Sequence, residues 1–150
     1  MISVGRSWLR DSARAVLVLV VDHDQSSRRW LEETIAGQGH LVECAWDEVT
    51  ALNVLRLTPG LDRAIVFNAA LDGGGGQATL RAIRDFDPKA RIIAFAAHYG
   101  IDFRIPLAVL PLPLDARSLE LALHLVVNMG IKQPAADARR TGATARPMAA

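Results

Sequence analysis

The chain has 150 residues, of which 51% are hydrophobic and 22% are charged, and its formal net charge is +1. This length and apolar content suit a single packed domain and exclude wholesale disorder. The charge is unevenly distributed: residues 1–15 carry a net +2, residues 132–150 a net +3, and residues 16–131, with 10 basic and 14 acidic side chains, a net −4. Because nucleic-acid-binding domains are normally basic, this acidic body disfavours nucleic acid as a partner.

The single cysteine, Cys44, excludes an internal disulfide and a cysteine-rich zinc site. The longest aliphatic run, residues 15–21, is far shorter than the about 20 residues that cross a bilayer, and no small-residue cleavage site follows it. We therefore expect a cytoplasmic protein with no transmembrane span and no signal peptide.

Short apolar runs alternate with longer amphipathic stretches, a pattern typical of strands and helices around a parallel sheet. The first run, residues 15–21, has no polar alternation, so both of its faces should be buried, as in a central parallel strand. In chain order, the pattern then predicts a helix over about 25–37, a strand over 41–45, a helix capped by Asp47 and closed by Pro59, a strand over 64–70, a helix ending before Pro88 and a strand over 92–97.

The alternation of predicted strands and helices is interrupted after residue 97. Residues 98–106 are too few and too irregular for a good helix, and a strand over 107–110 follows almost at once. The last helix is predicted to run from a cap at Asp115 to Gly130. The sequence thus predicts the α/β class, a five-stranded parallel sheet in a doubly wound sandwich, organised as a basic leader (1–15), one domain (16–131) and a disordered tail or linker (132–150).

Ligands of doubly wound folds bind at the carboxyl ends of the strands, so the strand ends are where function is expected. The first strand ends in Asp22, His23 and Asp24, whose carboxylates and imidazole suit a divalent cation. The alternative is that these aspartates only cap the helix that follows, a common use of Asp at this position.

Five segments resemble one known family, the receiver domains of two-component response regulators: residues 18–24 (Val-Leu-Val-Val-Asp-His-Asp), 39–43 (Gly-His-Leu-Val-Glu), 65–68 (Ile-Val-Phe-Asn), 92–98 (Ile-Ile-Ala-Phe-Ala-Ala-His) and 110–115 (Leu-Pro-Leu-Pro-Leu-Asp). The resemblance covers roughly residues 16–130 and implies a flavodoxin-like sandwich. It also implies an acidic Mg²⁺ cluster after strand one, a phosphoryl-accepting Asp that ends strand three, a Thr or Ser that ends strand four, and a Lys before the Pro that follows strand five.

This sequence departs from the family at four of its five chemically required positions. Asn68 stands at the phosphoacceptor position, Ala96 at the hydroxyl position, Leu112 at the lysine position and His23 at that of a main Mg²⁺ ligand. An amide is no nucleophile toward a phosphoryl donor and carries no charge to attract the metal. The chain therefore resembles a degenerate pseudo-receiver with no catalytic residue, in which Mg²⁺ binding by Asp22, His23 and Asp24 is at best weakened.

The segment between strands four and five is also short. Only 14 residues lie between Ala97 and Leu112, where the family fits a complete fourth helix and strand five. The fourth helix must then be missing or reduced to about one turn.

The predicted last helix is apolar around most of its circumference, with a polar stripe at Glu120, His124 and Asn128. A surface helix normally keeps one broad polar face, so the extra apolar side needs cover. We expect a partner or homodimer interface, formed by the following side chains: Leu119, Leu123, Val126 and Val127. The alternative is intramolecular cover by residues 105–114 or by the leader around Trp8.

These observations favour a phosphorylation-independent adaptor that binds a protein through the last helix and residues 98–114. Two alternatives stay open. One is a module gated by a ligand or a metal, in which the strand-end cleft uses Asp22, His23, Asp24 and His98. The other is the regulatory domain of a longer transcription factor, with residues 132–150 as its linker.

Overall fold

The computed structural model describes residues 16–70, 76–95, 102 and 104–141, with side chains up to Asn128. Five strands and four helices lie in this part of the chain. In chain order they are β1 (Val16–Val21), α2 (Gln25–Gly37), β2 (Leu41–Ala45), α3 (Glu48–Leu57), β3 (Asp62–Asn68), α5 (Gly76–Phe86), β4 (Arg91–Phe95), β5 (Ala108–Leu110) and α6 (Ala116–Thr141).

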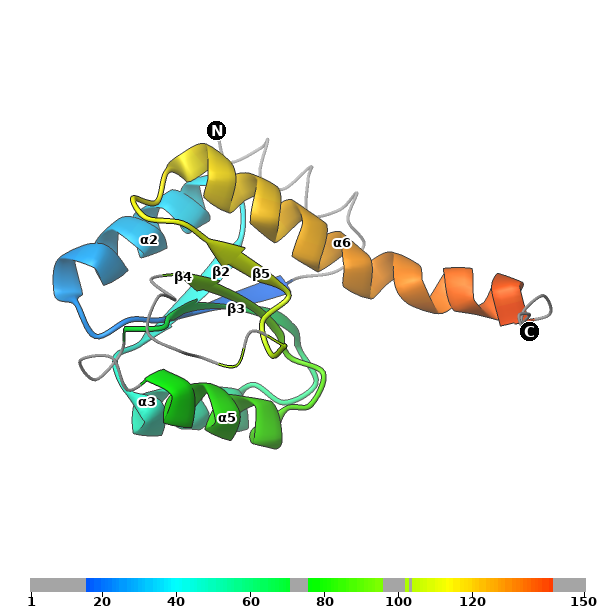
Figure 1. Cartoon of the computed structure of the whole chain (residues 1–150), viewed down its shortest axis with the longest axis horizontal. Helices are drawn as coiled ribbons and strands as arrows, with labels where there is room; N and C mark the ends of the chain where they lie inside the picture. The colour runs from blue at the N-terminus through cyan, green and yellow to red at the C-terminus, as the bar shows by residue number, and fades with distance from the viewer. Residues whose placement is uncertain (1–15, 71–75, 96–101, 103, 142–150) are drawn as a thin grey trace.

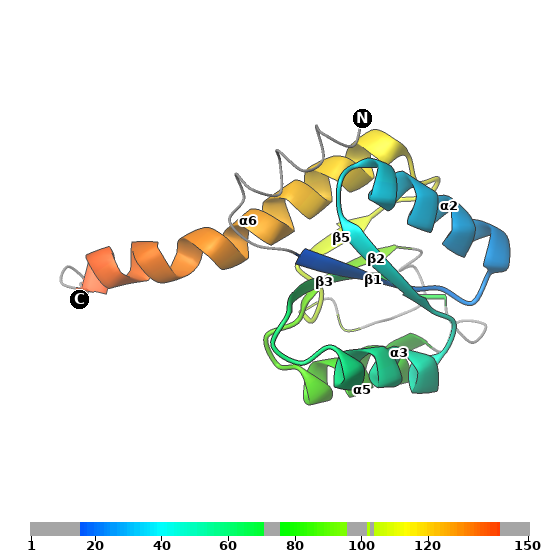
Figure 2. The ribbon, with the colours of Figure 1, turned by 180° about the vertical axis from the view of Figure 1, so that it is seen from behind.

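The strands form one parallel sheet in the order β2-β1-β3-β4-β5. Helices α2 and α6 cover one face of the sheet, and α3 and α5 cover the other (Figures 1 and 2). The predicted fold class is confirmed. The strand order reverses at β1 and β3, so the carboxyl ends of these two neighbours meet where ligands bind in such folds.

Strand β1 is the centre of the core, because all six of its side chains are buried. Leu19 and Val21 face α3 and α5, whereas Val18 and Val20 face α2 and α6. The two-residue alternation of a strand thus supplies both cores from one uninterrupted apolar run. Each such side chain contributes about 1.5–3 kcal/mol by leaving water, so β1 is the fixed element from which the functional end is positioned.

The connection between β4 and β5 contains no helix among its described residues, 102 and 104–107. Instead Ile105 packs against the core beside α3 and α5, Pro106 is buried, and the Leu107 amide donates to the Ile92 carbonyl at 2.8 Å. Residues 96–101 and 103 lie outside the described residues, so the missing or shortened fourth helix stays a prediction.

Helix α6 corrects one predicted boundary. The helix was expected to end at Gly130, with disorder or a linker beyond, but it continues to Thr141 and projects away from the sheet (Figure 1). The reason is composition: the Ala, Arg, Lys and Gln residues after Gly130 are good helix formers. Pro134 removes one backbone donor without ending the helix. Residues 142–150 and the leader, 1–15, lie outside the described residues.

Of the helices described, none is both long enough and apolar enough to cross a bilayer.

Candidate functional site

Asp22 is a fully buried carboxylate at the carboxyl end of β1. Its backbone amide donates to the Ala45 carbonyl at 3.0 Å, which holds the residue against β2. Its Oδ1 accepts two hydrogen bonds, from Asn68 Nδ2 at 2.9 Å and from the Asp24 amide at 3.0 Å. Among the described residues, its buried Oδ2 has no hydrogen-bond partner. The site thus holds a buried carboxyl group whose hydrogen bonding is incomplete.

Asn68, the last residue of β3, uses both ends of its amide. Nδ2 donates to Asp22, and Oδ1 accepts from the Ala70 amide at 2.8 Å. A charge-assisted hydrogen bond of this kind stabilises Asp22 and adds no second negative charge. A carboxylate at position 68 would instead face Asp22 at hydrogen-bond distance, which requires a cation or a shared proton.

His23 and Asp24 do not join Asp22 in a common ligand set. His23 is exposed and its Nδ1 lies 3.8 Å from Asp22 Oδ1, while Asp24 caps α2 by accepting from the Ser27 amide at 2.8 Å. In the part of the chain that the structure describes, no three His, Cys, Asp or Glu side chains gather closely enough to hold a metal ion. The capping alternative therefore accounts for Asp24, and Mg²⁺ binding stays a prediction.

Arg28 is a site residue that the sequence did not single out. Its Nη1 donates to the Asp22 backbone carbonyl at 2.9 Å, and its guanidinium lies 5.8 Å from the centre of the exposed Trp46 ring. Such stacking of a cation on an aromatic face is favourable, so Arg28 ties α2 to the end of β2 around the site. No sequence motif links residues 22, 28 and 46, because the sheet alone brings them together.

Leu112, which the resemblance places at the lysine position of receiver domains, has a side chain that is 53% exposed. It precedes Pro113 through a cis peptide bond. The residue forms one wall of a shallow groove of about 500 Å³ between α2 and the β5–α6 connection, lined by Ser27, Trp30, Phe95, Leu112, Pro113 and Leu114. No side chain of this lining carries a positive charge that could neutralise a phosphoryl group. Ala96 and His98 lie outside the described residues.

The predicted interface on the last helix is wrong. Leu119, Leu123, Val126 and Val127 are all buried within the domain. The first three pack against strand side chains such as Val66 and Ile93, joined by Leu110 and Leu114 from the connection. From the segment 105–114, Ala108, Leu110 and Leu114 pack in this core, so the intramolecular alternative is met in part. The apolar side chains that α6 exposes are Leu121 (50%) and Leu125 (64%).

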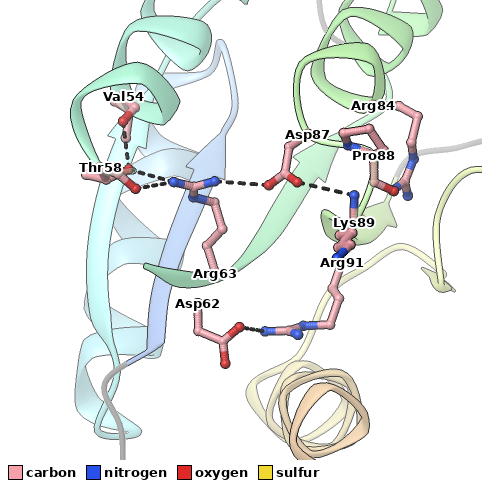
Figure 3. Close-up of polar contacts among 9 residues, drawn as sticks. All are labelled: Val54, Thr58, Asp62, Arg63, Arg84, Asp87, Pro88, Lys89 and Arg91. Atoms are coloured by element: carbon pink, nitrogen blue, oxygen red, sulfur yellow. Dashed lines mark hydrogen bonds and ion pairs between the residues drawn. The ribbon is translucent and has the colours of Figure 1, made fainter. Parts of the chain in front are cut away.

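The opposite end of the sheet carries two ion pairs (Figure 3). Arg63 pairs with Asp87 at 3.0 Å and also donates to the backbone carbonyl and hydroxyl of Thr58. Arg91 pairs with Asp62 at 3.0 Å. The Arg63 contacts join β3 to the residues that follow α3 and α5, and the Arg91–Asp62 pair joins the starts of β4 and β3. They stabilise the fold at the end of the sheet opposite to the strand-end site.

No protein-family model matches this sequence, and no curated protein matches it. Solved structures do match. A receiver domain protein from Clostridium thermocellum superposes with a TM-score of 0.70 at 17% identity, over 79% of this chain and 98% of that one. The Vibrio cholerae chemotaxis protein CheY4 gives 0.65 at 21% identity, over 75% and 98%. The fold is that of a receiver domain.

One match involves a longer protein. NtrX from Brucella abortus, solved with ADP, superposes with a TM-score of 0.70 at 24% identity over 87% of this chain, but the match spans only 30% of NtrX. The receiver fold therefore occurs among these matches both as nearly a whole chain and as one part of a larger one.

Proposed function

We propose that this chain is a receiver-fold signalling module that works without phosphoryl transfer and acts as a non-enzymatic adaptor. The observation that carries the proposal is the hydrogen bond between Asn68 Nδ2 and Asp22 Oδ1, 2.9 Å long and buried. The amide has no nucleophilic oxygen for a phosphoryl donor, and it occupies one lone pair of the carboxylate that would otherwise face a cation. Leu112 removes the positive charge expected beside a phosphoryl group.

The test is direct phosphorylation of the full chain. The protein is incubated with Mg²⁺ and a small phosphoryl donor such as acetyl phosphate, and intact mass is measured. We expect no acid-stable or acid-labile adduct. The Asn68→Asp variant is the matched control, because it restores an acceptor carboxylate at the same place. A stoichiometric adduct on the unmodified chain would overturn the proposal.

The partner surface that we propose lies on the solvent side of α6. Leu121 (50% exposed) and Leu125 (64% exposed) stand one helical turn apart on it. Exposed large apolar side chains that lie side by side mark protein-binding surfaces. We propose that a protein partner, or a second copy of the chain, covers this surface, and that no membrane or nucleic acid does.

Sedimentation over a range of protein concentrations tests self-association through this surface. We expect the Leu125→Glu variant to weaken dimerisation at least tenfold, because it places a charge at the centre of the apolar contact. Leu57→Glu is the control, since Leu57 is also exposed (80%, against 64% for Leu125) but belongs to α3, which covers the opposite face of the sheet. Equal effects of both variants, or none, would contradict a dimer at α6 and leave only a heterologous partner to test on the same two variants.

A ligand-gated module is the second candidate, favoured by the unpartnered Asp22 Oδ2 and by the groove beside Trp30. A ligand present at 100 times its Kd stabilises the folded state by about 2.7 kcal/mol. A thermal-shift screen of divalent cations, nucleotides and metabolites should then show a clear rise in Tm for at least one compound. An unshifted Tm across the screen would argue for the adaptor.

The third candidate is a regulatory domain of a longer transcription factor. The NtrX match, which spans 30% of that chain, supports it. The genomic reading frame that encodes this chain decides the matter, because a DNA-binding domain encoded in the same frame would establish it.

A further inference from the structure

The described part of the β4–β5 connection is held against the body of the domain by its own backbone and side chains. The Ile105 amide donates to the Asp102 carbonyl at 3.0 Å and closes a turn, and the Leu107 amide donates to Ile92 at 2.8 Å and joins β4. Ile105 packs on the core beside α5, and Pro106 is buried. A segment with buried apolar side chains and paired amides opens only at a cost in free energy.

Side chains from one face of helix α5 form hydrogen bonds and an ion pair with the same segment. Arg84 donates from Nη2 to the Ile105 carbonyl at 2.9 Å and from Nη1 to the Pro88 carbonyl at 2.6 Å. About two turns earlier, Gln77 Oε1 accepts from the Asp102 amide at 2.7 Å. Arg81, between them on that face, lies 3.7 Å from the Asp102 carboxylate. The segment is therefore fastened at both ends of its turn.

The helix that provides these contacts is itself fixed next to the strand-end site. A Cβ placed on Gly76 would lie 2.5 Å from the Ala69 carbonyl oxygen, so α5 starts in direct contact with the turn that follows Asn68. Thr79, Leu80 and Ile83 are buried along the rest of the helix. A rigid path thus runs from Asn68 through α5 to the segment that leads into β5.

We infer that residues 102 and 104–107 form a clasp with α5 that holds β5 and the exposed α6 surface in one arrangement, so that partner binding is not gated by a rearrangement between β4 and β5. This inference rests on the proposed function for the identity of the surface. The clasp fixes Leu107 beside Ile92 of β4, and thereby the start of β5.

Amide hydrogen exchange of the full chain, followed by NMR, tests the clasp. The amides of Asp102, Ile105 and Leu107 should exchange at least about a hundredfold more slowly than unprotected amides. Arg84→Met removes a charge-assisted hydrogen bond and should speed exchange of Ile105 and Leu107 by about tenfold to a hundredfold, with the β1 amides unchanged. Arg81→Met is the matched control on the same helix face, and it should change these rates less than threefold because Arg81 is largely exposed.

Gln77→Ala is the second variant, in case Arg84→Met fails to fold, and it should speed exchange at the Asp102 amide in particular. Unprotected Ile105 and Leu107 amides in the unmodified chain would overturn the clasp, as would equal acceleration of β1 and Leu107 in the variants. Addition of Mg²⁺ and beryllofluoride, a phosphoryl mimic, separates the two proposals. Shifts confined to residues around Asp22 and Asn68 would contradict the proposed function alone, whereas changed exchange over 102–110 would contradict the clasp.

Discussion

The two ends of the sheet differ in whether their charged side chains have partners of opposite charge. At the amino ends of β3 and β4, Arg63 and Arg91 each meet an aspartate at 3.0 Å, so each of these half-buried charges has an opposite partner (Figure 3). At the carboxyl ends, Asp22 is buried against the neutral amide of Asn68. The nearby Arg28 donates to the Asp22 backbone carbonyl, and the structure shows no bond from it to the carboxylate.

The difference separates paired charges from a carboxyl group that has only neutral partners. Opposite pairs hold strands and helix ends together, so removing one partner leaves an uncompensated charge. The Asp22 carboxyl group has a neutral amide beside it and only one of its two oxygens is hydrogen-bonded among the described residues. Substitutions at the two ends should therefore respond differently to added Mg²⁺.

The largest effect should come from Asn68→Asp. Two buried carboxylates would face each other across a 2.9 Å contact, and we expect a loss of about 3–5 kcal/mol in the free energy of unfolding without metal. Mg²⁺ should restore a large part of the loss, because hard oxygen ligands would then converge on it. Urea denaturation with and without Mg²⁺ measures both effects. Asn53→Asp, at an exposed position on α3, is the control and should show neither.

Arg63→Met should have the next largest effect. The Arg63 side chain is only 9% exposed, and its loss removes the ion-pair partner of Asp87 and the donor to two acceptors on Thr58. We expect the free energy of unfolding to fall by about 2–4 kcal/mol. Mg²⁺ should not restore this loss, which distinguishes the two ends of the sheet. A double-mutant cycle with Asp87→Asn isolates the pair, and a coupling free energy near zero would show that the Thr58 contacts carry the effect instead.

Gly76→Ala probes the backbone that supports the carboxyl end. Its new methyl group would lie 2.5 Å from the Ala69 carbonyl oxygen, so α5 must shift, at an expected cost of about 1–3 kcal/mol. Because Ala69 follows Asn68, the shift should also perturb the Asn68 side-chain amide resonances. Gly37→Ala, at a helix end with open space around it, should leave both stability and those resonances nearly unchanged. Unperturbed Asn68 resonances in Gly76→Ala would contradict the claim that the position of α5 affects the Asn68 side chain.

Much of the fold could be predicted because its signals are local. The run Val16–Val21 has no polar alternation, and only a strand buried on both faces suits it. The strand-end position of Asp22 followed from the same pattern. That of Asn68 followed only from the resemblance to receiver domains, because the pattern predicted a strand over 64–70, whereas β3 ends at Asn68. The bond between them could not be predicted, because two residues 46 positions apart acquire a 2.9 Å contact only when parallel strands come into register.

The sequence could not predict which apolar side chains of α6 face solvent, and the reason is different. Apolar residues surround this helix, so periodicity gives no unique inner stripe, and Leu123 looked as available for a partner as Leu125 does. The sheet resolves the ambiguity: Leu123 faces Ile93 in the core and Leu125 faces solvent. The Arg84–Ile105 contact was likewise hidden, because it depends on the path of an irregular segment.

The smallest expected effect concerns Asp47, which caps α3 beyond the end of β2. Its carboxylate accepts from the Thr50 amide and hydroxyl, both at 2.8 Å, and these bonds hold the pKa of Asp47 below its ordinary value of 3.8. Asp47→Ala should cost about 1 kcal/mol at neutral pH. Because the pKa is lowered in the folded state, the contribution is complete above the unfolded pKa and is lost as the pH falls below it. The difference in stability between the two chains should therefore shrink in acid denaturation, whereas that of Arg63→Met should begin to shrink only as Asp87 itself takes up a proton. A pH-independent difference for Asp47→Ala would mean that its hydrogen bonds to Thr50 carry no charge assistance.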